Sequence, residues 1–404
     1  MARVKALLLE NIHAEAVRLL EAEGIEVETR KGALDESELI ESLEGIDLLG
    51  IRSKTQVTRR VLEARPDLRA VGAFSIGTNQ IDLEAAAEQS IPVFNAPYSN
   101  TRSVVELAIG EIINLARHLG DHNRNMHNGL WDKTAKGSHE VRGRTLGIVG
   151  YGNIGSQLSV LAESLGMRVY FYDVVDRLAL GNAVRCDSLQ ELLSTVETVS
   201  IHLDGRVENT NLFNAETFAM MRPRSLFLNL SRGHVVDLEA LRDNLLSGHI
   251  AGAGLDVYPV EPKKAGDPFE SVLQGIPNVI LTPHIGGSTA EAQEDIGRFV
   301  AGKFRDLVST GSTYMSVNLP EVQLESLAEG ARLLYLHRNE PGVLATVNSV
   351  LGKHGVNIDR QQLTTRDQLG YVVTDCSNGI PQAALDEIRE IGATRRLTAL
   401  GEVR

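Results

Sequence analysis

The stretch "GIVGYGNIG", residues 147–155, carries the strongest structural signal in this sequence. It places Gly150, Gly152 and Gly155 in the spacing G-x-G-x-x-G, after a short apolar run and before a helical pattern. In a strand–turn–helix unit the first glycine permits the tight turn, the second lets the backbone approach a pyrophosphate, and the third allows close helix–strand packing. The N-terminus of the helix also attracts phosphate groups. The stretch therefore predicts a Rossmann-type dinucleotide-binding domain.

An acidic residue after the next strand-like run completes this fingerprint. Asp173 ends "RVYFYD", about 20 residues beyond the turn, as the dinucleotide-binding pattern requires. A carboxylate there binds the adenosine ribose hydroxyls and repels a 2′-phosphate, which favours NAD over NADP. The alternative is a glycine-rich turn that binds nothing. The residues of the turn expected to contact the cofactor are Gly150, Tyr151, Gly152, Asn153, Ile154 and Gly155.

Apolar runs alternate with helical patterns along most of the chain, which predicts an α/β protein with doubly wound parallel sheets. Residues 100–286 are expected to form the dinucleotide-binding domain, and residues 1–99 plus 287–325 a discontinuous, flavodoxin-like substrate domain. Residues 331–404 show the order βαββαβ of a ferredoxin-like domain. Capping-box spacings, Ser103 with Glu106 and Ser288 with Glu291, are expected to begin two long helices.

The overall composition excludes several classes of protein. A formal net charge of −13 argues against a general nucleic-acid binder, because phosphate contacts need a basic surface. No apolar run reaches the roughly 18 residues of a membrane span. Two cysteines, Cys186 and Cys376, do not make a disulfide framework, so a reduced cytoplasm is the expected location.

Three polar residues follow strand-like runs, where open α/β sheets place their ligands. Arg232 follows "LFLNLS", Glu261 follows "GLDVYPV", and His284 ends "VILTPH". Hydride transfer to or from a 2-hydroxy acid needs a cation for the carboxylate, and an arginine fork suits that role. It also needs an acid–base group, such as a histidine that titrates near neutrality, and a carboxylate that orients it and raises its pKa. The alternative to a catalytic group is that His284 is a core residue with a structural role and that "VEP" is a simple turn.

Four motifs, "GIVGYGNIG", "NLSRGHVVD", "GLDVYPVEP" and "LTPHIGGST", together resemble the D-isomer-specific 2-hydroxyacid dehydrogenases. The resemblance implies that Arg232, Glu261 and His284 are catalytic in the roles given above. It implies further cofactor contacts, with Asp256 expected at the nicotinamide amide. Asp204 departs from the family, which usually has proline there, so the contacts on the adenine side stay open. The additional cofactor residues implied are His202, Asp256 and Gly287.

The resemblance also implies a substrate site that the first domain helps to form. "GIRSKTQVT" is similar to the family's phosphate-binding loop, and "FSIGTNQID" to the loop that binds the substrate carboxylate. Lys54 stands where relatives often have a second arginine, and lysine keeps the charge but loses the fork. Solvated surface charges are the alternative for the basic residues. The expected substrate residues are Arg52, Ser53, Lys54, Gly77, Asn100 and Lys133.

The tail resembles an ACT domain, a regulatory module that binds amino acids and often pairs with a second copy. In "HRNEPGVLATVNSVLGKHGVNI", residues 337–358, we expect His337, Asn339 and Asn357 to bind L-serine, because asparagine supplies both donors and acceptors. Asparagines that merely form turns are the alternative. Gly330, in the linker before this domain, is expected to act as a hinge.

Over the whole chain, the resemblance is to family members that oxidise D-3-phosphoglycerate to 3-phosphohydroxypyruvate with NAD, the first step of L-serine biosynthesis. We therefore expect a cytoplasmic homotetramer inhibited by L-serine, without nucleic-acid, membrane or metal partners. Trp131 is expected either in an arm that reaches a neighbouring subunit or as a plain packing residue. The alternative functions are a reductase of 2-oxoglutarate or glyoxylate and, from another class, an NAD-sensing interaction protein.

Overall fold

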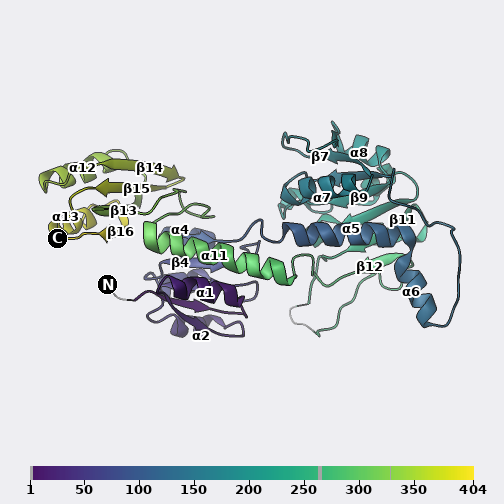
Figure 1. The fold of residues 1–404 in the computed structure, drawn as a ribbon, viewed down its shortest axis with the longest axis horizontal. Coiled ribbons are helices and arrows are strands. Elements are labelled where there is room, and N and C mark those ends of the chain that lie inside the picture. The colour runs from purple at the N-terminus through teal and green to yellow at the C-terminus, as the bar shows by residue number, and fades with distance from the viewer. Residues whose placement is uncertain (1–2, 263–265, 328) are drawn as a thin grey trace. The chain divides into compact units, whose positions relative to one another are not determined.

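The computed structural model describes residues 3–262, 266–327 and 329–404. The chain divides into two compact units (Figure 1). One holds Met1–Ser99 together with Gln293–Arg404, and the other holds Asn100–Ala292. Within the described ranges, no helix combines the length and the hydropathy that crossing a membrane requires.

The second unit is built on a seven-stranded parallel sheet with the order β12-β11-β10-β9-β6-β7-β8. From β6 at the centre, β7 and β8 follow towards one edge of the sheet, and β9, β10, β11 and β12 follow towards the other edge. This reversal beside the first strand is the Rossmann arrangement, and ligands bind at the switch point. The predicted fold of this part is confirmed. The strands are β6 (Thr145–Val149), β7 (Arg168–Tyr172), β8 (Val184–Arg185), β9 (Thr198–Ile201), β10 (Ser225–Asn229), β11 (Ile250–Leu255) and β12 (Val279–Leu281).

Helices cover both faces of this sheet, as buried parallel strands require. Apolar side chains of α5 and α7, such as Ile112 and Leu158, pack with the strands in one core. Side chains of α8, α9 and α10, such as Leu192 and Phe218, pack with the strands in another core. The helices are α5 (Thr101–Arg117), α6 (Leu119–His127), α7 (Asn153–Ser164), α8 (Leu189–Thr195), α9 (Ala215–Met220) and α10 (Leu238–Leu246).

The first unit contains a five-stranded parallel sheet with the order β2-β1-β3-β4-β5, the flavodoxin-like arrangement. The returning helix α11 packs on it through Val300 and Phe304. A Cβ at Gly72 of β4 would lie 2.6 Å from Val300, so the glycine makes room for this helix. The elements are β1 (Lys5–Leu8), α1 (Ala14–Ala22), β2 (Glu26–Thr29), α2 (Glu36–Ser42), β3 (Leu48–Ile51), α3 (Arg59–Ala64), β4 (Ala70–Ala73), α4 (Leu83–Glu88), β5 (Val93–Phe94) and α11 (Ala290–Thr310).

The predicted starts of the two long helices are wrong. Helix α5 begins at Thr101, and the Ser103 hydroxyl lies 2.7 Å from that of Thr289 instead of capping the helix. Thr289, rather than Ser288, accepts a hydrogen bond from the first turn of α11, at the amide of Ala292. Because the Ser103–Thr289 contact holds this segment to α5, residues 287–292 group with the second unit and not with the returning segment.

The tail forms a four-stranded antiparallel sheet with the order β14-β15-β13-β16 and two helices. This is the predicted ferredoxin-like arrangement. Gly330, the expected hinge, has φ +84°, and a Cβ there would lie 2.1 Å from the carbonyl oxygen of Cys376. Such tight packing argues against a free hinge at this residue. The elements are β13 (Ala331–Arg338), α12 (Val343–Lys353), β14 (Arg360–Arg366), β15 (Leu369–Cys376), α13 (Gln382–Arg389) and β16 (Thr394–Gly401).

The tail also makes specific contacts with the rest of the first unit. Arg332 is buried, binds both carboxylate oxygens of Asp375, and donates to the carbonyl of Thr310 at the end of α11. Tyr371 donates its hydroxyl hydrogen to the carbonyl of Gly311 at 2.7 Å. Arg396 of β16 donates to backbone carbonyls in the loops that precede β4 and β5, at Pro66, Leu68 and Ser90.

Candidate active site

The glycine turn lies between β6 and α7, at the switch point of the Rossmann sheet. Gly150 has φ +91°, and a Cβ there would lie 2.5 Å from the carbonyl oxygen of His202. A Cβ at Gly155 would lie 2.3 Å from the carbonyl oxygen of Gly150, so both positions require glycine. A Cβ at Gly152 would meet no atom within 4 Å, and no side chain caps α7. The turn therefore offers open space and uncapped helix amides, which fit a pyrophosphate.

Asp173 follows β7 and lies against the glycine turn. Its carboxylate accepts hydrogen bonds from the amides of Tyr151, at 2.8 Å, and Val175, at 2.9 Å. The Arg177 side chain pairs with it at 3.8 Å. A carboxylate fixed in this way next to the turn is suited to the hydroxyls of the adenosine ribose.

The side chains of Tyr151 and His202, two residues expected to contact the cofactor, are held by other protein side chains. The Tyr151 ring is buried, stacks on Phe171, and bonds to Ser159 through its hydroxyl. The ring of His202 bonds to Ser200 at 2.9 Å, and burial lowers its pKa to about 4. The carbonyl oxygen of His202, not its ring, lies beside Gly150 of the glycine turn, and a contact of His202 with the cofactor stays a prediction.

The loop after β9 contains Asp204 in place of the usual proline. Its carboxylate accepts hydrogen bonds from the side chains of Arg206, at 2.8 Å, and Asn209, at 3.0 Å. The hydrogen bond from Arg206 holds the pKa of Asp204 below its usual range. These bonds shape the loop in place of the ring constraint that proline would supply.

The structure brings His284 and Glu261 together. Nδ1 of His284 lies 2.8 Å from Oε2 of Glu261, and Oε1 of Glu261 accepts from the amide of Tyr258 at 3.1 Å. The hydrogen bond with Glu261 raises the pKa of His284 against the opposing effect of burial. Burial raises the pKa of Glu261, but the hydrogen bonds from His284 and Tyr258 outweigh it, and its pKa is lowered. The pair therefore favours an imidazolium beside a carboxylate.

Arg232 lies in the turn that follows β10. Its Nη1 donates to the carbonyl of Ser231 at 2.7 Å, and its own carbonyl accepts from the Asn229 side chain at 3.0 Å. Its charge acts on both Glu261 and His284, where it favours the carboxylate and opposes the imidazolium. The three residues predicted as a catalytic group thus belong to one electrostatic cluster.

Gly233 fixes the approach of the arginine turn to the loop that carries Glu261. A Cβ at Gly233 would lie 1.9 Å from the carbonyl carbon of Tyr258, which is backbone and cannot move aside cheaply. We predict that Gly233→Ala separates Arg232 from the pair and lowers kcat/KM at least about tenfold, because about 1.4 kcal/mol of lost transition-state stabilisation has that effect. Steady-state kinetics checks this, with Gly110→Ala as the control, because Gly110 lies in helix α5 of the same unit and a Cβ there meets no atom within 4 Å. Unchanged kcat/KM in Gly233→Ala would contradict it.

Asp256 has a role that the sequence did not reveal. It is buried, and its carboxylate accepts hydrogen bonds from the amides of Ile285, at 2.8 Å, and Gly286, at 2.7 Å, and from the hydroxyl of Thr282, at 2.6 Å. These bonds enclose His284, whose backbone is left-handed at φ +54°. Asp256 therefore holds the segment that presents the histidine, in addition to any contact with the nicotinamide amide.

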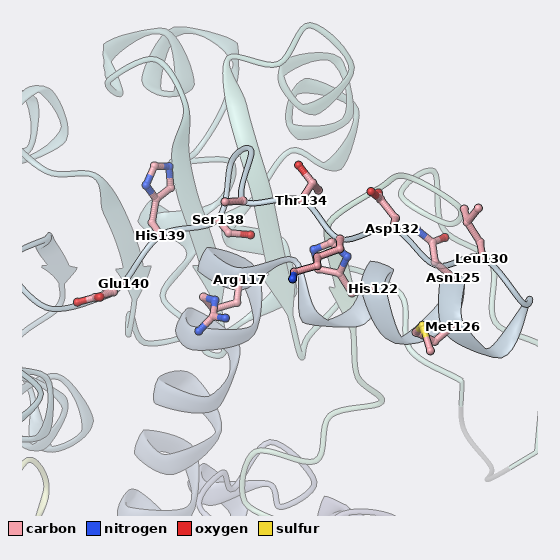
Figure 2. Close-up of a pocket in the computed structure, with 12 residues that line it drawn as sticks. Arg117, His122, Asn125, Met126, Leu130, Asp132, Thr134, Ser138, His139 and Glu140 are labelled. Atoms are coloured by element: carbon pink, nitrogen blue, oxygen red, sulfur yellow. The ribbon is translucent and has the colours of Figure 1, made fainter.

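The remaining predicted residues of the second unit lie apart from this cluster or at its edge. A Cβ at Gly287 would lie 2.4 Å from the Asn100 side-chain nitrogen, so these two predicted residues are adjacent. Lys133 lines a cavity of about 530 Å³ between α6 and the segment that follows it. Figure 2 shows this cavity, with the neighbouring residues Asp132 and Thr134 labelled. The other residues that line this cavity also lie between positions 117 and 140, and the His284–Glu261 pair is not among them.

In the first unit, Arg52, Ser53 and Lys54 form a tight loop directly after β3. The carboxylate of Glu10, which the sequence did not mark as functional, accepts hydrogen bonds from the backbone amides of this loop. Gly77 lies in the loop after β4, where its carbonyl accepts from the Ser75 hydroxyl at 2.8 Å. A Cβ at Gly77 would meet no atom within 4 Å, so its backbone is open to a ligand.

The predicted effector residues of the tail differ in exposure. His337 is buried in β13 and stacks on Tyr335, and its Nε2 has no partner among the described residues. Asn339 and Asn357 are exposed, after β13 and before β14 respectively. A Cβ at Gly370 would lie 2.4 Å from the His337 ring, so this glycine makes room for the imidazole. The unpartnered ring nitrogen is available to a ligand that reaches it.

Comparison with known sequences gives matches along nearly the whole chain. Residues 109–286 match the family described as D-isomer specific 2-hydroxyacid dehydrogenase, NAD binding domain. Residues 333–396 match the AHAS small subunit-like ACT domain. The chain is 49% identical to D-3-phosphoglycerate dehydrogenase of Escherichia coli K12 over 401 residues, which cover 98% of each chain. It is 48% identical to the enzyme of that name from Haemophilus influenzae over 99% of this chain and 98% of the relative.

Solved structures resemble this chain over three quarters of its length. A D-lactate dehydrogenase from Sporolactobacillus sp. aligns with a TM-score of 0.69 and 28% identity, and covers 78% of this chain and 99% of its own. The D-lactate dehydrogenase from Aquifex aeolicus, solved with NAD and lactic acid, aligns with a TM-score of 0.64 and 25% identity over 75% of this chain and 95% of its own.

Proposed function

The chain belongs to the D-3-phosphoglycerate dehydrogenases, within the D-isomer-specific 2-hydroxyacid dehydrogenase family, and we propose that it oxidises D-3-phosphoglycerate to 3-phosphohydroxypyruvate with NAD. The observation that carries this proposal is the His284–Glu261 pair, 2.8 Å apart, in one electrostatic cluster with Arg232. This arrangement supplies an acid–base group, its orienting carboxylate and a carboxylate-binding cation. The second candidate is a reductase of 2-oxoglutarate or glyoxylate, and no feature of the described residues favours these acids over 3-phosphohydroxypyruvate.

Each of the three residues has one task in this mechanism. Arg232 binds the substrate carboxylate through its guanidinium fork. Nε2 of His284 takes the proton of the C2 hydroxyl during oxidation and returns it during reduction. Glu261 fixes the imidazole through Nδ1 and stabilises the imidazolium that forms. Bound NAD would supply the acceptor for the hydride that leaves C2.

Groups of the second unit would hold the cofactor. The open face at Gly152 and the uncapped start of α7 would hold the pyrophosphate. Asp173 would bind the adenosine ribose hydroxyls and exclude a 2′-phosphate. The carboxylate of Asp256 is already engaged by three donors, so its remaining acceptor capacity would serve the nicotinamide amide.

The substrate's second anionic group, its phosphate, would bind to Arg52, Ser53 and Lys54. Two cationic side chains from one tight loop suit a dianion, although they could also receive a second carboxylate. The backbone at Gly77 would contribute to binding the substrate carboxylate. Asn100 and Lys133 are further candidates for contact with the substrate.

The tail, an ACT-like domain, would bind L-serine as an end-product inhibitor through His337, Asn339 and Asn357. The unpartnered Nε2 of the buried His337 supports this assignment. Inhibition requires two states of the enzyme that serine binds with different affinity. The direct contacts of Arg332, Tyr371 and Arg396 with the flavodoxin-like part offer a physical route for such coupling. The functional division proposed has three parts: residues 1–99 with 293–325 for the substrate, residues 100–292 for the cofactor, and residues 331–404 for the effector.

We expect a homotetramer in the cytoplasm. Helix α6 and the segment after it expose large apolar side chains, a composition typical of protein–protein contacts. They are Leu119, Met126, Leu130 and Trp131. Strand β14 lies at one edge of the tail sheet, where a second sheet could add its own strand.

The direct test follows NADH absorbance with 3-phosphohydroxypyruvate, with and without L-serine. We predict that NADH is consumed and that serine suppresses its consumption. Consumption that serine leaves unchanged would keep the enzyme assignment and reject the feedback claim. Consumption with 2-oxoglutarate or glyoxylate but not with 3-phosphohydroxypyruvate would favour the second candidate. NADH binding without turnover of any of these acids would favour an NAD-sensing protein.

A further inference from the structure

We propose that Glu10 is a positioning residue that gives the enzyme its preference for a phosphorylated substrate, by holding the loop of residues 52–55 in a phosphate-binding shape. The inference rests on the proposed function, because it takes this loop to be the phosphate site. Glu10 lies two residues beyond β1, and the parallel pairing of Leu8 with Gly50 brings it beside Arg52. Glu10 and this loop are more than forty residues apart in the sequence, so the sequence alone does not indicate that they are in contact.

The contacts of Glu10 are directed at the loop backbone. Oε1 accepts from the amides of Thr55, at 2.8 Å, and Arg52, at 3.3 Å, and Oε2 accepts from the amide of Lys54 at 3.0 Å. The residue is 7% exposed. Charge-assisted bonds to backbone amides in a buried setting are the stronger kind of protein hydrogen bond. One carboxylate therefore fixes three of the four residues of the loop.

This arrangement also leaves the cationic groups of the loop available. Among the described residues, Glu10 forms no ion pair with Arg52 or Lys54, although both belong to the loop that it binds. Within the described ranges, the one hydrogen bond of the Arg52 guanidinium goes to the backbone carbonyl of Glu10, at 3.5 Å. The ammonium of Lys54 has no hydrogen-bond or ion-pair partner in the described part of the chain. The carboxylate binds the backbone and leaves the charges for an incoming anion.

The backbone of Glu10 is strained in a way that serves these contacts. It has φ +60°, and the next residue, Asn11, has φ +54°. Left-handed backbone costs roughly 1 kcal/mol for a non-glycine residue, and such strain concentrates at functional positions. The conformation turns the chain after β1 and directs the carboxylate to the neighbouring loop.

Glu10→Gln tests the role with little change in size. The glutamine oxygen can keep the bonds from Arg52 and Thr55, but its NH₂ group then faces the amide of Lys54, donor against donor. We expect KM for 3-phosphohydroxypyruvate to rise about tenfold or more, as the loss of one buried hydrogen bond predicts, with kcat within about threefold. KM for hydroxypyruvate, the same acid without phosphate, should stay unchanged. Asp47→Asn is the control, because Asp47 accepts a backbone amide, that of Lys5, near the start of β1 and far from the loop.

A rise confined to the phosphorylated acid supports the proposal. If the wild type prefers the phosphorylated acid, two results overturn the role of Glu10 and leave the proposed function intact. These are an equal rise in KM for both acids and no rise in KM for either. A wild type without that preference overturns the proposed substrate and the positioning role with it. Hydrogen exchange on the wild-type chain needs no variant: the amides of Arg52, Lys54 and Thr55 should exchange more slowly than that of Ser53. Equally fast exchange at all four overturns the proposal.

Discussion

Replacing His284 with asparagine is expected to lower kcat for the reduction of 3-phosphohydroxypyruvate about a thousandfold, within the range that a general acid–base group contributes. Asparagine tolerates the left-handed backbone that His284 adopts, so the loop keeps its shape while the proton donor is lost. KM should change little, because Arg232 and the phosphate loop supply the binding. Steady-state kinetics at saturating NADH measures both constants.

His249→Gln is the matched control for this loss. His249 belongs to the same unit but precedes β11, at the opposite edge of the sheet from the end of β12 that His284 follows. Its ring bonds to the carbonyl of Phe218 and has no part in the cluster with Glu261. A kcat of His284→Asn within tenfold of the wild type would remove His284 from the mechanism.

The pH dependence separates the role of Glu261 from that of His284. The hydrogen bond to Glu261 raises the pKa of His284, so Glu261→Gln should lower it. Reduction needs the imidazolium, and its rate falls as pH rises through this pKa; the falling limb should therefore lie at lower pH in the variant. Oxidation needs the neutral imidazole, so its rising limb should move to lower pH as well. Profiles of kcat/KM in both directions measure these shifts, and limbs at unchanged pH would contradict the orienting role.

The fold was predictable because its signals are local. The glycine turn, the acid after the next strand and the alternation of apolar runs with helical patterns each occupy a short segment. The positions of Arg232, Glu261 and His284 after successive strands follow from the same rule, since parallel strands end at one edge of the sheet. The sequence could therefore indicate the cluster before any coordinates were known.

What escaped prediction depends on contacts between distant segments. Ser103 has capping-box spacing, yet its hydroxyl contacts Thr289, which no local pattern reveals. Glu10 looks like the polar end of an apolar run, and its role requires the pairing of β1 with β3. The sequence did hold one usable signal for Glu111: it falls on the apolar face of α5, between Ala108 and Leu115, where a charge is out of place.

Glu111 is expected to destabilise the protein at neutral and alkaline pH. Both of its carboxylate oxygens are buried without a hydrogen-bond partner among the described residues, and the side chain packs against Gly254 of β11. Burial, with a smaller contribution from the charge of Asp256, raises its pKa to about 8. Tyr258 is the other titratable group that interacts with it. The folded protein must therefore keep a proton that the unfolded chain releases near its ordinary pKa of 4.5.

The sign of the pH dependence follows from this difference. A raised pKa in the folded state gives stability that is complete below pH 4.5 and is lost as pH rises towards 8. At pH 7 the loss is roughly 3 kcal/mol, from about 1.4 kcal/mol per pH unit between the two pKa values. Glu111→Leu removes the titration and the unsatisfied oxygens. We predict that it raises the melting temperature at pH 7 by roughly 6 to 12 °C, as expected for a unit of this size, and by much less at pH 5.

Thermal unfolding of both proteins from pH 5 to pH 8 measures this effect. The quantity that decides is the growth of the difference with pH, because any gain from added apolar packing is the same at every pH. Glu106→Leu is the control, since Glu106 lies on the exposed side of the same helix, paired with Arg102. A difference that stays constant across this range would show that Glu111 is ionised in the folded protein. If the prediction holds, the wild type retains a destabilising acid whose charge interacts with Asp256, the residue that holds the His284 segment. A lower kcat in Glu111→Leu would then show that this acid serves catalysis at the expense of stability.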